Sequence, residues 1–208
     1  MRHILVMVLL ILSAGCALKT DRSSQPVPIR KNSPVVYIHP LDNIYHEASV
    51  GVLPFAVPDN FGKDQGRRIA ELFKDILLGK RSFPKVRLIE GGGDNPEAAM
   101  ERGRHAGVDL VMVGRIHHAL EGSEFGGARL EAAIKLLNVR TGNTVWYIEH
   151  SLDQPMDFPK VSTLRNFFAS FNPPPVRPSH GAPAMPNMLA KAAVDTANII
   201  AGARTVQR

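Results

Sequence analysis

The chain has a single cysteine, Cys16, among its 208 residues, which excludes a disulfide within the chain. Aromatic residues are only 6% of the chain and do not alternate with runs of lysine and arginine, which argues against a nucleic-acid-binding surface. The formal net charge of +6 bears on solubility more than on fold. The longest uninterrupted apolar run, residues 4–12, is shorter than the roughly 20 residues that a membrane-spanning helix needs.

That apolar run has the features of a cleavable leader. Arg2 gives it a basic start, and the small residues 13–15 follow it. Residues 12–16 (LSAGC) resemble the lipobox of bacterial lipoproteins, although the leucine stands one position further from the cysteine than is usual. The resemblance implies a leader over 1–15 and an acylated Cys16 as the mature N-terminus. The alternative is an ordinary secretory leader, which would leave Cys16 as an unpaired thiol.

The resemblance also implies a location. In the lipoproteins that this leader resembles, an aspartate directly after the cysteine retains the protein in the inner membrane, and this chain has Ala17 there. The expected location is therefore the outer membrane, with the chain facing the periplasm and held to the lipid through Cys16.

The composition changes near residue 49. Residues 16–48 are polar and proline-rich at first, which is typical of a tether. Residues 35–38 could add a short edge strand, closely bracketed by Pro34 and Pro40. The folded domain is expected over 49–205, with a Phe- and Pro-rich insertion at 153–186.

Hydrophobic periodicity predicts the elements of this domain. A strand at 49–55, a helix at 62–78, a strand at 85–89, a helix from an Asp94 cap to about 105 and a strand at 108–116 form a β-α-β-α-β core. A hairpin over 128–139 and 144–152, with a turn at 141–143, and a helix over 188–203 follow. The predicted fold is an α/β (α+β) domain whose mixed sheet has a parallel core, with the last helix packed on the sheet.

Three stretches resemble one group of bacterial envelope lipoproteins. They are 50–55 (VGVLPF), 106–114 (AGVDLVMVG) and 136–146 (LLNVRTGNTVW). The group includes the curli-secretion lipoprotein CsgG, the Pel exopolysaccharide lipoprotein PelC, the penicillin-binding-protein activator LpoB and the N-terminal domain of TolB. The resemblance implies a non-enzymatic accessory or ring-forming component of an export or surface-assembly system. The alternative is a lipoprotein regulator that docks on a peptidoglycan synthase.

Several residues could form a metal- or ligand-binding site, and each also has a purely structural interpretation. His117, His118 and His150 could bind zinc, but neighbouring strand residues face opposite ways, so partly exposed strand-end histidines are the simpler interpretation. Residues 91–93 (GGG) could cradle a phosphate, but no complete fingerprint follows, which favours a turn. Trp146 is expected in the core rather than stacked on a ligand. No catalytic, cofactor or metal residue is predicted.

The insertion carries the one predicted interaction surface. If residues 160–171 are helical, Leu164, Phe167, Phe168 and Phe171 share one stripe. This stripe could bind a second protomer, another envelope protein or the lipid surface. It could equally pack on the core of its own chain.

Overall fold

The computed structural model describes residues 29–41, 44–59, 61–62, 64–92, 95–123, 126–156 and 184–202. Within these ranges seven strands form one sheet in the order β1-β7-β6-β5-β3-β4, and β2 also pairs with β7. The strands are β1 (Arg30–Lys31), β2 (Val35–Ile38), β3 (Ser49–Val52), β4 (Lys85–Leu88), β5 (Leu110–Leu120), β6 (Arg129–Asn138) and β7 (Thr144–Asp153), and the helices are α2 (Gln65–Gly79), α3 (Pro96–Ala106) and α5 (Ala184–Gly202).

The sheet is mixed, as predicted. Strand β3 pairs in parallel with both β4 and β5, and α2 and α3 make the two crossovers. Strands β5, β6 and β7 are long and antiparallel, and Gly142 turns the β6–β7 hairpin with a φ of 76°. The predicted parallel core and hairpin are confirmed.

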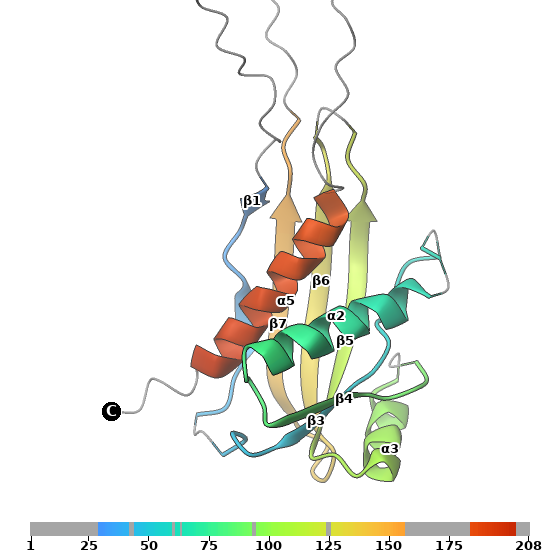
Figure 1. Cartoon of the computed structure of the whole chain (residues 1–208), viewed down its shortest axis with the longest axis vertical. Helices are drawn as coiled ribbons and strands as arrows, with labels where there is room; N and C mark the ends of the chain where they lie inside the picture. The colour runs from blue at the N-terminus through green and yellow to red at the C-terminus, as the bar shows by residue number, and fades with distance from the viewer. Residues whose placement is uncertain are drawn as a thin grey trace, which may run out of the picture.

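Two helices cover one face of the sheet and one helix covers part of the other. Figure 1 shows α5 and α2 lying across the long strands on the same side. The larger core lies under them and includes Phe73 of α2, Met188 of α5 and Ile134 of β6. A smaller core joins Ala99 of α3 to Val111 of β5. Because strand residues alternate between faces, α3 packs on the opposite face from α2 and α5.

The helix that precedes β5 begins differently from the prediction. Its N-cap is Asn95, whose side chain accepts a hydrogen bond from the Glu97 backbone N–H at 2.9 Å, and Pro96 follows as the first helical residue. The expected cap, Asp94, lies outside the described residues. A proline at the first helical position places the cap on the residue directly before it. The helix ends as predicted at Gly107, which has a φ of 63°.

The sheet begins earlier in the chain than residue 49. Strands β1 and β2 pair antiparallel with β7, with Arg30 opposite Asp153 and Val35 opposite Glu149. The predicted edge strand at 35–38 is therefore present, but it belongs to the folded body. The composition of this segment resembles a tether because its hydrogen-bond partners lie on β7, far away in the sequence.

Candidate interaction surface

Exposed apolar side chains gather on strand β2 and on the segment that follows it. Of the eight large hydrophobic side chains that are exposed in the described part of the chain, five lie between residues 35 and 44. We call these five the edge strip: Val35, Tyr37, Ile38, Leu41 and Ile44. Leu41 is 90% exposed and Ile44 is 68% exposed. Such a gathering of apolar surface over one short segment is typical of a contact with another molecule.

The backbone of β2 is also available. Among the strands that the structure describes, β2 pairs only with β7, so its outer edge has free hydrogen-bonding groups. Residues 32–41 contain no aspartate, glutamate, lysine or arginine. Natural edge strands that remain free usually carry such charges to prevent pairing with other chains. The opposite edge, β4, does carry them, because Lys85 and Arg87 are both exposed.

A group of polar and aromatic side chains lies beside the edge strip. The rings of Tyr37 and Tyr147 stack with centroids 5.0 Å apart. Both hydroxyls donate to the carboxylate of Glu149, that of Tyr37 at 3.0 Å. The Nζ atom of Lys135 lies 4.5 Å from the centre of the Tyr147 ring. We call these four residues the tyrosine–glutamate cluster.

Hydrogen bonding shifts the pKa values of Glu149 and of the two tyrosines. Glu149 has a pKa below its ordinary value, chiefly because it accepts a hydrogen bond from Tyr147. The same hydrogen bond raises the pKa of Tyr147 to about 12. Hydrogen bonding to Glu149 also raises the pKa of Tyr37. The cluster therefore presents Tyr37 in a fixed orientation beside an ionised carboxylate.

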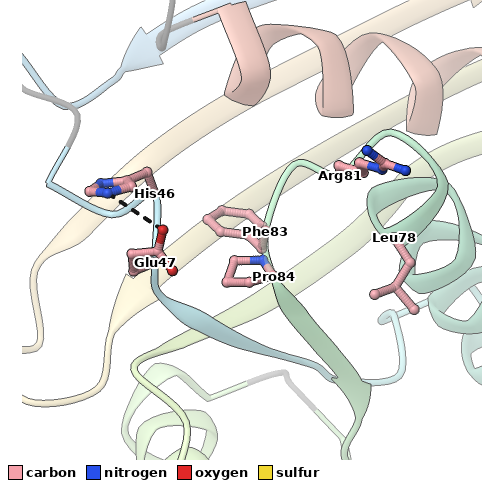
Figure 2. A pocket seen from close by; sticks show the side chains of 6 residues that line it. All are labelled: His46, Glu47, Leu78, Arg81, Phe83 and Pro84. Atoms are coloured by element: carbon pink, nitrogen blue, oxygen red, sulfur yellow. Dashed lines mark ion pairs between the residues drawn. The ribbon is translucent and has the colours of Figure 1, made fainter.

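A shallow pocket lies close to the end of the edge strip. It has a volume of about 380 Å³, and Figure 2 shows Phe83 and Pro84 of the α2–β4 connection between the pair His46 and Glu47 on one side and Leu78 and Arg81 on the other. His46 Nε2 lies 3.6 Å from Glu47 Oε1. Phe83 is buried and meets Trp146 edge-on at 6.0 Å. These residues form an apolar floor with polar groups at its rim.

A second cavity, of about 660 Å³, lies at the end of the sheet near the β6–β7 turn. Its best-defined polar group is Asp109, which accepts hydrogen bonds from the Ser49 backbone N–H at 2.8 Å and from the Ser49 hydroxyl at 2.7 Å. These bonds hold the pKa of Asp109 below its ordinary value. The role of Asp109 here is to tie the start of β3 to the start of β5.

The three histidines that were candidate zinc ligands do not form one group in the structure. His117 and His118 lie within β5 and are exposed. The interpretation as an exposed residue is wrong for His150, which is only 3% exposed and whose Nε2 lies 2.8 Å from the Thr196 hydroxyl of α5. No three potential metal-binding side chains of the described residues come together in a group that could hold an ion. The histidine that packs in the core thus connects β7 to α5.

Trp146 and the glycine-rich stretch at 91–93 have structural roles where the structure describes them. Trp146 lies in the core as predicted, 3% exposed, and its Nε1 has no hydrogen-bond partner among the described residues. The glycine-rich stretch forms a turn at Gly91, which has a φ of 96°, and Arg102 donates to the Gly92 carbonyl. The Arg102 side chain thus satisfies a backbone carbonyl of that turn by a hydrogen bond.

The residues that the sequence placed at an anchor and at an interface lie outside the described ranges. This holds for Cys16 and for the stripe formed by Leu164, Phe167, Phe168 and Phe171. No helix of the described ranges is both long enough and apolar enough to cross a membrane. The edge strip and the tyrosine–glutamate cluster were not predicted. Their signal in the sequence is the uncharged stretch 32–41 and the spacing of Tyr147 and Glu149, two apart on one strand.

Comparison with known proteins gives matches only among solved structures. No protein-family model and no curated protein matches the chain. The PelC dodecamer structure from Paraburkholderia phytofirmans aligns with a TM-score of 0.44 and 16% identity over 81% of this chain and 95% of that one. Lipoprotein GNA1162 from Neisseria meningitidis aligns with a TM-score of 0.38 and 13% identity, over 60% of this chain and 94% of that one.

The C-terminal domain of LpoB from Salmonella enterica aligns with a TM-score of 0.37 and 13% identity, over 54% of this chain and 87% of that one. PelC and LpoB are two of the proteins that the sequence motifs resemble. At these identities, and with every one of these TM-scores below 0.5, the matches do not establish membership of a group and carry no conclusion about function.

Proposed function

We propose that this protein is a lipid-anchored, non-enzymatic component of an export or surface-assembly system in the bacterial envelope, and that it acts by binding other protein chains. The observation that carries this proposal is the edge strip on β2 and the segment after it, where exposed apolar side chains coincide with a strand edge that no other described strand pairs with. A surface of this kind favours a protein partner over a small substrate, because strand pairing and flat apolar contact are how proteins recognise one another.

The places where the described chain stops support an orientation relative to the membrane. The start of β1, the end of β7 and the start of α5 all lie at the upper end of the sheet in Figure 1. Residues 17–28 connect Cys16 to this end and span at most about 43 Å when fully extended. An acylated Cys16 would therefore hold this end of the sheet toward the membrane. We assign that membrane to the outer membrane because Ala17, rather than aspartate, follows the cysteine.

The anchor is tested by mass spectrometry of the protein extracted from membranes. We expect fatty acyl groups on Cys16 and an N-terminus at that residue. A matched variant with an ordinary secretory leader and Cys16→Ser should appear in the soluble envelope fraction. An unmodified thiol on a protein that is not held by membranes would overturn the proposed anchoring.

The binding role is tested by placing a photo-reactive amino acid at Tyr37 in the full-length protein in cells. We expect covalent adducts with a protein, either another envelope protein or a second copy of this chain. Leu120 is a matched control, because its side chain is 51% exposed but lies away from the edge strip. If Tyr37 gives no more adduct than Leu120, the edge strip is not a binding surface and the proposed function loses its main support.

A further inference from the structure

The two outer edge strands of the sheet have the same length and run in opposite directions. Strand β2 has four residues and is limited by Pro34 and Pro40, and β4 has four residues and follows Pro84. Strand β2 is antiparallel to β7, and β7 runs in the same direction as β5, which is parallel to β3 and β4. Strand β2 therefore runs opposite to β4, so copies that stand side by side in the same orientation would meet as antiparallel strands.

The side chains of the two edges also match, face by face. On the face covered by α2 and α5, Val36 of β2 is partly buried, and so are Val86 and Leu88 of β4. The other face has Tyr37 beside the ionised Glu149 on the β2 side, and Lys85 and Arg87 on the β4 side. Joining the edges would place apolar residues beside apolar residues, and cations beside an aromatic ring and a carboxylate.

We propose that the β2 edge of one copy binds the β4 edge of a second copy, so that the sheet continues from chain to chain. The inference rests on the proposed function and names the partner of the edge strip. The contact is head to tail, because it uses two different surfaces of the same chain. It repeats until the chains close into a ring or extend as a filament.

The position of the chain ends favours this contact over a symmetric one. Two β2 strands could pair with each other about a two-fold axis, but that pairing reverses the strand direction between copies. The end of the sheet to which the Cys16 tether attaches would then point to opposite sides in the two copies. In the β2–β4 contact, this end points the same way in every copy, as anchoring in one membrane requires.

Disulfide cross-linking distinguishes the two arrangements. Cys16 is the chain's only cysteine and is acylated in the proposed protein, so introduced cysteines are the only free thiols. Opposed residues of antiparallel strands have Cα atoms about 4.5–5.5 Å apart, within the range of a disulfide. The full-length membrane protein is oxidised with Tyr37→Cys combined with either Lys85→Cys or Arg87→Cys, since these residues share one face.

We expect at least one of these double variants to form a ladder of covalent oligomers larger than a dimer, and each single variant to remain uncross-linked. Leu120→Cys combined with Arg87→Cys is the control and should give no ladder. A covalent dimer from Tyr37→Cys alone would show the two-fold arrangement instead. The proposal is also wrong if every combination remains monomeric.

A charge reversal gives a second, independent measurement. Arg87→Glu changes an exposed side chain and should leave the fold intact while weakening self-association about tenfold or more in detergent, measured as molecular mass by light scattering. Arg68→Glu is the matched control, because Arg68 is also exposed but lies on α2. An Arg87→Glu variant with the same mass as the parent at every concentration would overturn the inference.

The two proposals can fail separately. If photo-crosslinking at Tyr37 captures a different envelope protein while the cysteine pairs give no ladder, the binding role stands and the β2–β4 contact is wrong. If Tyr37 captures nothing and Cys16 is unmodified, the proposed function itself is wrong.

Discussion

Glu149 lies on the face of the sheet opposite α2 and α5. It accepts hydrogen bonds from Tyr37 on β2 and from Tyr147 on its own strand, and so joins the edge strand to the hairpin. A carboxylate that accepts hydrogen bonds from two hydroxyl groups is stabilised in its ionised form. The result is a tyrosine pair whose rings stay stacked and whose hydroxyls are difficult to ionise.

Replacing this carboxylate should change the titration of the tyrosines. In Glu149→Gln, the hydrogen bond to a carboxylate, which is the main cause that raises the pKa of Tyr147 to about 12, is replaced by a weaker one to a neutral amide and the negative charge is absent, so this pKa should fall toward 10. Tyrosinate absorbance at about pH 10.5 should therefore be larger in the variant than in the parent. Glu131→Gln is the control, because Glu131 pairs with Arg129 and contacts no tyrosine in the described structure. Equal titration curves for Glu149→Gln and the parent would contradict the hydrogen-bonded cluster.

At the scale of elements, the position of α2 depends on the closeness of its first turn to Phe55, in the segment that follows β3. The Gly66 carbonyl accepts a hydrogen bond from the Phe55 backbone N–H at 3.0 Å. A Cβ atom at Gly66 would lie 2.2 Å from the Phe55 carbonyl oxygen, which is a backbone atom and cannot rotate away. The glycine is therefore required by the close approach of two backbones, and not by a turn.

Two glycines of the same helix should respond in opposite ways to alanine. Gly66→Ala should lower the free energy of unfolding by about 1–3 kcal/mol, because the new methyl group forces α2 away from Phe55. Gly79→Ala meets no atom within 4 Å and should be neutral or stabilise by up to about 1 kcal/mol through helix propensity. Urea unfolding of the non-acylated protein, followed by the fluorescence of Trp146, measures both. Equal effects at the two positions would show that the approach at Gly66 is not tight.

At the scale of the whole molecule, carboxylates with lowered pKa values make stability depend on acid. Glu101 is held by Arg104 within α3, whereas Asp109 and Glu149 accept hydrogen bonds that join strands. Asp109 and Glu149 both have pKa values below their ordinary values of 3.8 and 4.5, so the folded state binds protons less readily than the unfolded chain. Their contribution is complete above about pH 4.5 and is lost as the pH falls through the folded values. The free energy of unfolding should therefore decrease below about pH 4.5.

The double variant Asp109→Asn and Glu149→Gln should flatten this acid dependence. Asp109→Asn alone should cost about 1 kcal/mol near neutral pH, because the exposed carboxylate has two hydrogen bonds from Ser49 that solvent partly replaces. Urea unfolding at neutral and at acid pH, compared between parent and double variant, measures the difference. An equally steep loss of stability in the double variant would assign the acid sensitivity to other groups.

The alternation and helical spacing of apolar residues were sufficient to predict most elements of the sheet core. The strand at Lys85–Leu88, the helix at Gln65–Gly79 and the hairpin β6–β7 lie close to their predicted positions. Local patterns predicted them because each pattern reports which face of a single element is buried. The same patterns placed β1 and β2 in the tether, since their pairing with β7 joins residues more than 100 positions apart.

The candidate surface was harder to predict than the fold. Tyr37, Tyr147 and Glu149 are unremarkable in their own segments, and only the register of β2 against β7 brings them together. For His150 the prediction was wrong in the opposite sense. Its place on a strand suggested exposure, but its side chain is buried against Thr196 of α5. In both cases the partner comes from a distant segment, which one-dimensional spacing does not reveal.

By itself, the sequence determined the class of the sheet, the order of its elements and the single cysteine available for an anchor, because these follow from hydrophobic period, glycine and proline positions, and composition. Only the tertiary structure decided that β2 and β4 are the outer edges among the described strands, that they run in opposite directions, and that β1 begins at the same end of the sheet at which β7 ends. Edges and ends are relations between segments, and long-range strand pairing creates them.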